Sequence, residues 1–319
     1  MNTKYQLVAD IGGTNARFAI CEKGSANLQT IETFDCAQFE SPIEAIAQYL
    51  SDSKISVESA CLAVAGPVKE SEDTVRLTNN TWTFSRNQIV SRFSLDRLVV
   101  VNDFVAAAMA TTAIASDDLF FLSEDSQFDP NQQRCILGPG TGLGVAGMLS
   151  YKGKTLVIST EGGNRSFSPE TEIEDYILRF LRTELQIVSC EVLLSGSGLV
   201  NIYRALCSYY KQAVNYSKAY EISEAALKQN DLPQKALSAF FAILGSFAGD
   251  CALTFGATGG VYIGGGIAPK LHQALAKSKF RERFESKLNY KAYLEKIPTA
   301  IVMHPYPGLL GAAACLSNI

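Results

Sequence analysis

Two glycine-containing turns, one in each half of the chain, constrain its fold most strongly. The first lies in VADIGGTNARFAI (residues 8–20) and the second in CILGPGTGLGVAGML (residues 135–149). Short apolar runs precede and follow each turn, and such runs predict strands. Each segment therefore predicts a β-hairpin. Their similarity suggests a duplicated α/β unit, with a ligand-binding cleft between the two halves.

The rest of the chain alternates between predicted strands and predicted helices. Helices are expected after Ser41 and Ser168, each acting as an N-cap before a proline, and after Gly198. This alternation predicts an α/β protein with largely buried sheets. The expected strands span residues 6–9, 17–21, 60–65, 98–101, 135–137, 144–149, 155–158 and 260–263.

Composition excludes several classes of protein. The chain has 319 residues, of which 47% are hydrophobic and 19% charged, as expected for one large or two ordinary globular domains. Its net charge of −4 and scattered basic residues argue against a nucleic-acid surface. Residues 240–268 contain a single charge, Asp250, but their glycine-rich turns favour a buried helix over 236–255 rather than a membrane span. No leader is recognised, so we expect a cytoplasmic protein that binds no membrane.

The cysteines are expected to be buried free thiols. An even number would allow disulfides, but most lie in apolar runs and no export signal accompanies them. With two histidines and no Cys-x-x-Cys, a zinc site is not expected. The eight cysteines are Cys21, Cys36, Cys61, Cys135, Cys190, Cys207, Cys251 and Cys315.

The first turn, Gly12-Gly13-Thr14-Asn15, does not fit the common nucleotide motifs. A dinucleotide-binding fold needs G-x-G-x-x-G leading into a helix, whereas the residues after this turn alternate as a strand. The Walker pattern is also absent. The turn's N–H groups and the Thr14 hydroxyl would suit phosphate, with Asp10 near a hydrated Mg²⁺. A plain tight hairpin is the alternative, since two glycines suffice for it.

A second turn of the same kind lies around Gly140, Thr141 and Gly142. Because two such turns occur, a pair of phosphate-facing hairpins is a simpler interpretation than two unrelated tight hairpins. A third glycine cluster, Gly264 to Gly266, follows a predicted buried strand and leads into a helix near Pro269. Glycine there would let a flat ring approach the backbone, or would serve helix–strand packing. Both interpretations remain open.

Acidic residues follow several of the predicted strands and turns. Asn102 and Asp103 end a strand, where Asp103 would be either a helix N-cap or a ligand-binding group. Glu161 lies beside two glycines, and Glu191 precedes a glycine-opened helix. These three carboxylates suit a polyhydroxylated ligand, because carboxylates accept hydrogen bonds from hydroxyls. One of them would deprotonate a hydroxyl that attacks a phosphate.

Eight motifs, in one order along the chain, resemble the bacterial ATP-dependent glucokinase family of the hexokinase and actin-like ATPase superfamily, the type lacking the zinc motif. They are DIGGTN, LTNNTWTFS, NDF, GPGTGLGV, EGGN, EVLLSGSGLVNIYRA, GGVYIGGGI and PGLLGAAA. The resemblance implies an actin-like (ribonuclease-H-like) ATPase fold with two α/β domains around a cleft. The small domain would span 1–112 plus 304–319, including a C-terminal helix over 307–317, and the large domain 113–303.

The resemblance also assigns roles to individual residues. It implies that Asp103 is the catalytic base and that Asp10 holds Mg²⁺ through water. Sugar contacts fall on Asn102, Asp103, Glu161, Asn164 and Glu191. The phosphate loops fall on Gly12, Gly13, Thr14 and Asn15 and on Gly140, Thr141 and Gly142, and the nucleoside cluster on Gly264, Gly265 and Gly266.

The implied reaction transfers the γ-phosphoryl group of ATP to the 6-hydroxyl of glucose, giving glucose 6-phosphate and ADP, a step of glycolysis. A homodimer is usual in the family. Asn164 departs from the family pattern, which has histidine there in many members, and this change bears on sugar affinity and preference. A kinase for another hexose and a non-catalytic sugar sensor are the alternatives. Sensor relatives carry an N-terminal helix-turn-helix, for which the first strand leaves no room.

Overall fold

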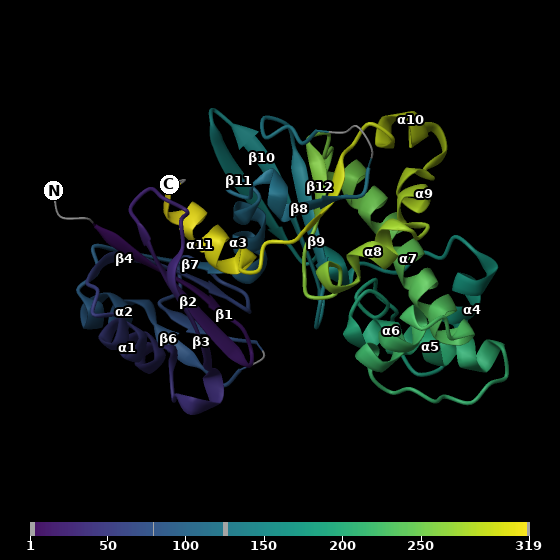
Figure 1. The fold of residues 1–319 in the computed structure, drawn as a ribbon, viewed down its shortest axis with the longest axis horizontal. Helices are drawn as coiled ribbons and strands as arrows, with labels where there is room; N and C mark the ends of the chain where they lie inside the picture. Colours follow the sequence, from purple (N-terminus) through teal and green to yellow (C-terminus); the bar gives the residue numbers. More distant parts are fainter. Residues whose placement is uncertain (1–3, 79, 124–126, 318–319) are drawn as a thin grey trace. The chain divides into compact units, whose positions relative to one another are not determined.

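The computed structural model describes residues 4–78, 80–123 and 127–317. By their contacts, these residues form two compact units (Figure 1). The first comprises the chain up to Ser116, Tyr151–Ser159 and the chain from His304, and the second comprises Asp117–Ser150 and Thr160–Met303. The predicted small domain lacks residues 113–116 and 151–159 of the first unit. Matching the units to the small and large domains of the family remains a prediction.

The first unit is built from strands and helices that alternate along the chain. Its elements are β1 (Tyr5–Ile11), β2 (Asn15–Glu22), β3 (Gln29–Asp35), η1 (Cys36–Gln38), α1 (Pro42–Ser53), β4 (Val57–Val64), β5 (Thr74–Arg76), β6 (Thr83–Ser85), α2 (Arg86–Phe93), β7 (Arg97–Asn102), α3 (Asp103–Ala110), most of β11 (Lys154–Thr160) and α11 (Pro307–Ser317).

A five-stranded sheet in the order β3-β2-β1-β4-β7 forms the centre of this unit. β1 is antiparallel to β2 and parallel to β4, which is parallel to β7. The carboxyl ends of β1, β4 and β7 therefore meet at one edge of the sheet. Ligands of α/β folds bind at such edges.

Alternating residues of β1 bury both faces of the sheet. Leu7 packs in one cluster with Ile46 of α1. Val8 packs in another with Met109 of α3 and Leu309 of α11. The helices α3 and α11 contact each other along their lengths (Figure 1). The apolar alternation of the strand thus determines that helices cover both sides.

The boundary between the units falls within η2 (Ser116–Asp118), and the second unit is mixed α/β. Its elements are β8 (Leu119–Phe121), β9 (Arg134–Pro139), β10 (Leu143–Tyr151), η3 (Gly162–Asn164), α4 (Glu172–Leu181), α5 (Gly196–Tyr209), α6 (Ala219–Leu227), α7 (Asp231–Phe255), β12 (Gly260–Ile263), η4 (Pro269–Leu271), α8 (His272–Ala276), α9 (Phe280–Glu285), η5 (Leu288–Tyr290), α10 (Lys291–Leu294) and β13 (Thr299–Val302).

The strands of the second unit lie in the order β10-β9-β12-β13-β8. β9 and β10 form an antiparallel hairpin, and β12 is parallel to both of its neighbours. The predicted hairpins at the two glycine turns are therefore both present, one in each unit. In each unit, the strand after the turn excludes the helix that a dinucleotide motif requires.

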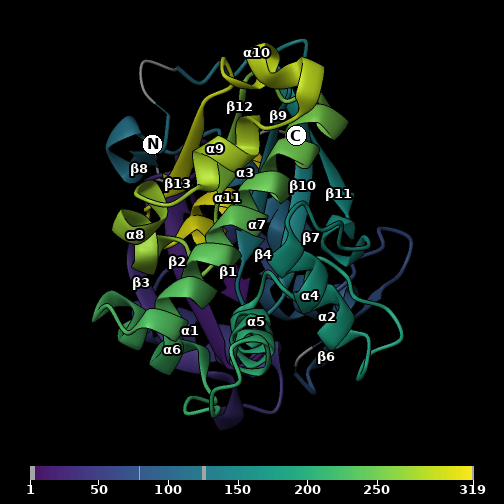
Figure 2. The same ribbon diagram turned by 90° about the vertical axis from the view of Figure 1, so that its right-hand side faces the viewer.

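The helix α7 is the main helix of the second unit and packs against α5, α6 and α9 (Figure 2). Among the described residues it is the one helix long and apolar enough to cross a membrane, and 78% of its most apolar window is buried inside the protein. A core helix has such a composition because apolar neighbours surround it. The predicted buried helix is confirmed, although it begins earlier than expected, at Asp231.

Local capping decides where two predicted helices begin. The prediction that Ser168 caps a helix is wrong, because α4 begins at Glu172 and the Thr171 side chain accepts the N–H of Glu174 at 3.3 Å. Ser41 does precede α1, but its side chain makes no capping hydrogen bond. The prediction of free thiols is confirmed, since all eight cysteines are buried and unpaired.

Candidate active site

The first glycine turn carries Asp10 near the end of β1. The N–H of Gly12 donates to the carbonyl of Asn15 at 2.9 Å, which closes the turn between β1 and β2. A Cβ atom on Gly12 would meet no atom closer than 3.5 Å, and the φ of Gly12 is not positive. Neither packing nor backbone conformation therefore requires glycine here. Space beside a backbone turn is what an approaching phosphate needs.

The surroundings of Asp10 bring together two residues that sequence reasoning missed. Arg17 lies opposite Asp10 in the hairpin register, and its Nη1 donates to Oδ2 at 3.3 Å. Gly308, in the first turn of α11, lies so close that a Cβ there would be 2.5 Å from the Asp10 Cγ. Burial raises the pKa of Asp10, and the Arg17 guanidinium opposes that rise. The positive end of α11 also favours the ionised carboxylate.

Asn102 and Asp103 lie where β7 passes into α3, as predicted. Asn102, rather than Asp103, is the N-cap, because its Oδ1 accepts the N–H of Phe104 at 2.9 Å. The amide nitrogen of Asn102 also donates to the carbonyl of Gly66 at 3.1 Å. The alternative of Asp103 as N-cap is therefore wrong. Asp103 is instead the first helical residue, available for another role.

The carboxyl group of Asp103 is half-buried and held by the backbone. Its Oδ1 accepts the N–H of Phe104 at 2.9 Å. Burial raises the pKa of Asp103, the hydrogen bond from Phe104 lowers it, and the negative charge of Asp10 raises it further. The two acids thus influence each other at the same sheet edge. A carboxylate with a raised pKa is a better proton acceptor.

The second glycine turn binds the carboxylate of Glu191. The N–H of Leu143 donates to Glu191 Oε2 at 2.8 Å, and the N–H of Gly140 donates to the carbonyl of Gly142 at 2.8 Å. A Cβ on Gly142 would lie 2.6 Å from Glu191 Oε2, so glycine is required for this contact. The N–H of Gly196, at the start of α5, donates to the carbonyl of Gly140 at 2.9 Å. The turn, Glu191 and α5 therefore form one group.

The third glycine cluster lies next to this turn. Gly265 has a φ of +75°, and a Cβ there would be 2.4 Å from the carbonyl oxygen of Pro139, so close packing accounts for that glycine. A Cβ on Gly266 would have no neighbour within 4 Å. Of the two open interpretations, packing thus explains Gly265, whereas Gly266 borders open space. The helix expected near Pro269 begins as η4 and continues as α8.

The segment Glu161 to Asn164 completes the group in the second unit. Glu161 and Asn164 are exposed at the two ends of this short turn. The N–H of Glu191 donates to the carbonyl of Gly163 at 2.9 Å, and Gly163 lies against the backbone of Leu143. The structure therefore gathers the sugar-contact candidates of the second unit beside its glycine turn. In the first unit it gathers Asp10, Asp103 and the first turn at one sheet edge.

The fold of this chain is that of solved glucokinases. A ROK family glucokinase from Streptomyces griseus, whose structure was solved in complex with glucose and AMPPNP, has this fold. It superimposes with a TM-score of 0.65 at 17% identity, covering 98% of both chains. The predicted fold class is confirmed.

Closer relatives define the family. The Glucokinase family pattern matches residues 7–319. The glucokinase of Chromohalobacter salexigens is 41% identical over 317 residues, which cover 99% of this chain and 98% of the relative. The crystal structure of a glucokinase from an Antarctic psychrotroph has a TM-score of 0.91 at 38% identity, covering 99% of both chains. The chain belongs to the glucokinase family, so the prediction of an ATP-dependent hexose kinase is confirmed.

Proposed function

We propose that Asp103 is the catalytic base of this glucokinase and acts on the 6-hydroxyl of glucose. The 6-oxygen attacks the γ-phosphorus of ATP, its proton passes to Asp103, and the bond between the γ-phosphorus and the bridging oxygen of ADP breaks. The observation that carries this assignment is the position of Asp103. It follows the carboxyl end of β7, the end of a strand at which α/β folds bind ligands, with one oxygen held by the Phe104 N–H and the pKa raised by burial.

In this proposal, Asn102, Glu161, Asn164 and Glu191 hold the sugar. Carboxylate oxygens accept hydrogen bonds from sugar hydroxyls, and the amides of Asn102 and Asn164 donate and accept. Glu191 is already held by the N–H of Leu143, so its second oxygen has a fixed direction. A fixed set of acceptors orients the 6-hydroxyl and reduces the entropy lost on reaching the transition state.

The phosphates of ATP would bind at the two glycine turns, formed by Gly12, Gly13, Thr14 and Asn15 and by Gly140, Thr141 and Gly142. The nucleoside would bind beside Gly264, Gly265 and Gly266. Backbone N–H groups carry much of this task, since the chain has no Walker motif. The open space at Gly266, and the absence of any contact closer than 3.5 Å at Gly12, support this assignment.

Asp10 is the residue proposed to hold Mg²⁺, through water. Among the described residues there is no cluster of three or more metal-binding side chains. A lone carboxylate fits an ion that arrives with ATP, because Mg²⁺ keeps several waters and takes its other ligands from phosphates. When bound, the ion neutralises charge on the transferring phosphoryl group.

Gly308→Ala tests the role of Asp10 without changing a polar group. The new Cβ would lie 2.5 Å from the Asp10 Cγ and must displace the carboxylate. We expect kcat/KM for MgATP to fall roughly 10- to 100-fold, measured from initial rates at saturating glucose. Ser317→Ala, at the other end of α11, is the control. Unchanged MgATP kinetics in Gly308→Ala would remove Asp10 from the nucleotide site.

Glucose is the proposed substrate, and Asn164 makes another hexose the second candidate. A coupled assay with ATP and a panel of hexoses should give the highest kcat/KM for glucose. In Asn164→His, we expect the KM for glucose to change by more than kcat, because this side chain lies in the segment 161–164, called the sugar segment below, and is not the proposed proton acceptor. A higher kcat/KM for another hexose would overturn the choice of glucose. Equal kinetics in both proteins would show that position 164 does not contact the sugar.

We further propose that the enzyme acts in glycolysis, in the cytoplasm, as a homodimer. The family resemblance supports all three statements. The cytoplasmic location is also consistent with eight free cysteines, since reducing compartments keep thiols unpaired.

A further inference from the structure

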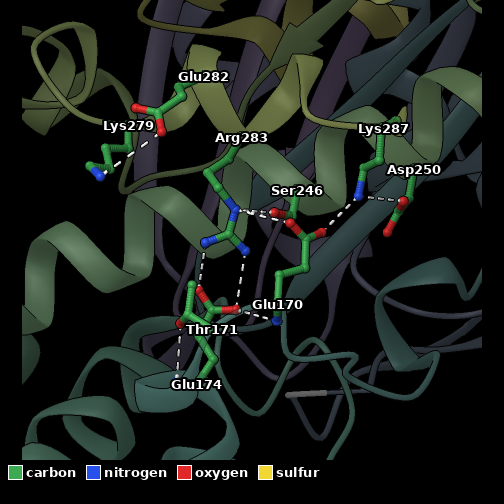
Figure 3. Close-up of polar contacts among 9 residues, drawn as sticks. All are labelled: Glu170, Thr171, Glu174, Ser246, Asp250, Lys279, Glu282, Arg283 and Lys287. Carbon is green, nitrogen blue, oxygen red and sulfur yellow. Dashed lines mark hydrogen bonds and ion pairs between the residues drawn. The ribbon is translucent and has the colours of Figure 1, made fainter. Parts of the chain in front are cut away.

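A network of charges joins α4, α7 and α9 in the second unit, and its central pair, Arg283 with Glu174, is buried (Figure 3). Arg283 of α9 makes a two-pronged contact with Glu174 of α4, at 2.6 and 3.1 Å, and its Nε lies 3.1 Å from Glu170. Lys287 bridges Glu170 and Asp250 of α7, at 2.9 and 2.8 Å. The network therefore ties α4, α7 and the end of α9 together.

Arg165 extends this network to the sugar segment. Its Nη2 lies 2.5 Å from Oδ2 of Asp250, and its guanidinium lies over the ring of Phe247, 4.6 Å from the centroid. Asp250 thus sits between two cations, Arg165 on one side and Lys287 on the other. One carboxylate of α7 connects the sugar segment to the rest of the network.

Backbone hydrogen bonds connect Arg165 to the 161–164 turn and to Cys190, the residue before Glu191. The N–H of Arg165 donates to the carbonyl of Gly162 at 3.3 Å, and the N–H of Cys190 donates to the carbonyl of Arg165 at 2.8 Å. The N–H of Glu191 donates to Gly163 at 2.9 Å. A shift of Arg165 would therefore move both the 161–164 turn and Glu191.

Apolar packing does little to hold this segment. A cavity of about 240 Å³ lies beside it, lined by Arg165, Ser166, Cys190, Ser246 and Asp250 among others. Between Glu161 and Ser166, Gly163 is the one buried residue, and it has no side chain. Where packing is loose, a directional ion pair supplies the rigidity that a binding site needs.

We propose that the Arg165–Asp250 ion pair positions Glu161, Asn164 and Glu191 for the sugar, with α7 as the rigid support. This inference rests on the proposed sugar-binding role of those three residues. Arg165 and Asp250 act through the segment and are positioning residues. Replacing Asp250 with asparagine removes the negative charge between Arg165 and Lys287 and leaves these two cations to repel each other.

The test compares the KM for glucose with the KM for ATP in each variant. For Asp250→Asn, we expect the KM for glucose to rise on the order of 10- to 100-fold, while the KM for ATP stays within about two-fold. Arg165→Lys keeps the charge but loses the planar fork, so it should show a smaller rise. Glu184→Gln is the matched control, because it breaks an ion pair with Arg204 in the same unit whose side chains are 35% and 44% exposed, close to the exposure of Arg165 and Asp250. It should leave both KM values unchanged.

Glu191→Ala separates failure of this inference from failure of the proposed function. If Glu191→Ala raises the KM for glucose but Asp250→Asn and Arg165→Lys do not, the positioning role is overturned and the sugar site stands. If Glu191→Ala leaves the KM unchanged, the proposed sugar site itself is wrong. Lower thermal stability with unchanged KM values would mean that the pair only supports the fold. Should Asp250→Asn prove insoluble, Arg165→Lys decides by the same criteria.

Discussion

Replacing Asp103 with asparagine is expected to lower kcat for glucose phosphorylation by about 10²- to 10⁴-fold, the usual contribution of a general base. Asparagine keeps the shape of the side chain and can still accept the Phe104 N–H, but it cannot take the proton of the 6-hydroxyl. The KM for glucose should therefore change little. A coupled spectrophotometric assay over a range of glucose concentrations measures both quantities. Near-normal kcat would remove Asp103 as the base.

The same variant should be more stable than the parent at neutral pH. Burial raises the pKa of Asp103 above its ordinary value of 3.8, so the folded protein must ionise a group that prefers to stay protonated. That cost is absent below the ordinary pKa and complete above the raised one. The gain in melting temperature of Asp103→Asn should therefore be larger at pH 7.5 than at pH 4.5. A gain independent of pH would show that ionisation of Asp103 does not cause it.

Among the single substitutions discussed, Glu174→Gln is expected to cause the largest loss of stability. The Glu174 side chain is 3% exposed and faces Arg283, which is 10% exposed (Figure 3). Removing the carboxylate leaves a buried guanidinium with only part of its compensation, from Glu170 at 3.1 Å. We expect the free energy of unfolding to fall by about 3 to 5 kcal/mol. Urea denaturation, followed by circular dichroism, measures it.

Two further variants test whether an uncompensated buried charge causes that loss. Glu184→Gln breaks an exposed pair of similar geometry, at 35% and 44% exposure, and should lose no more than about 1 kcal/mol. Glu174→Leu combined with Arg283→Met removes both charges and should recover much of the loss, since well-packed apolar residues often replace a buried pair at little cost. If the double variant were as unstable as Glu174→Gln, an uncompensated charge would not be the cause.

The sequence predicted those parts of the fold that depend on local pattern. The hairpins at the two glycine turns were predictable because apolar runs flank each turn. Five strands were missed, and two of them, β5 and β6, have only three residues each and pair with each other. The other three were missed for a physical reason. β3 and β8 lie at sheet edges with little burial, and β13 has four residues, so their pairing comes from distant neighbours rather than from their own pattern. The N-cap of α4 was misplaced because Ser168 and Thr171 both carry a hydroxyl and only the backbone decides between them.

The residues of the candidate site also fall into two groups, those that the sequence could predict and those that it could not. Acids at strand ends and glycines in turns can be recognised in the sequence, so Asp10, Asp103 and Glu191 could be proposed from it. Arg165 and Asp250 are 85 residues apart, and their contact exists only once α7 has packed. Gly308 likewise lies far along the chain from Asp10, and its closeness to that carboxylate exists only once α11 has packed. Register could have indicated Arg17, since a short turn places it opposite Asp10.

The close packing of α11 on α3 has a consequence for synthesis on the ribosome. A Cβ on Gly311 would lie 1.7 Å from the carbonyl oxygen of Ala106, so the two backbones touch, and α11 buries one face of the first sheet. The part of that face that α3 does not cover stays uncovered until residues 307–317 emerge. At about 5 to 20 residues per second, roughly 200 intervening residues take about 10 to 40 seconds. During this interval the nascent first unit exposes an apolar sheet face, the kind of surface that chaperones bind.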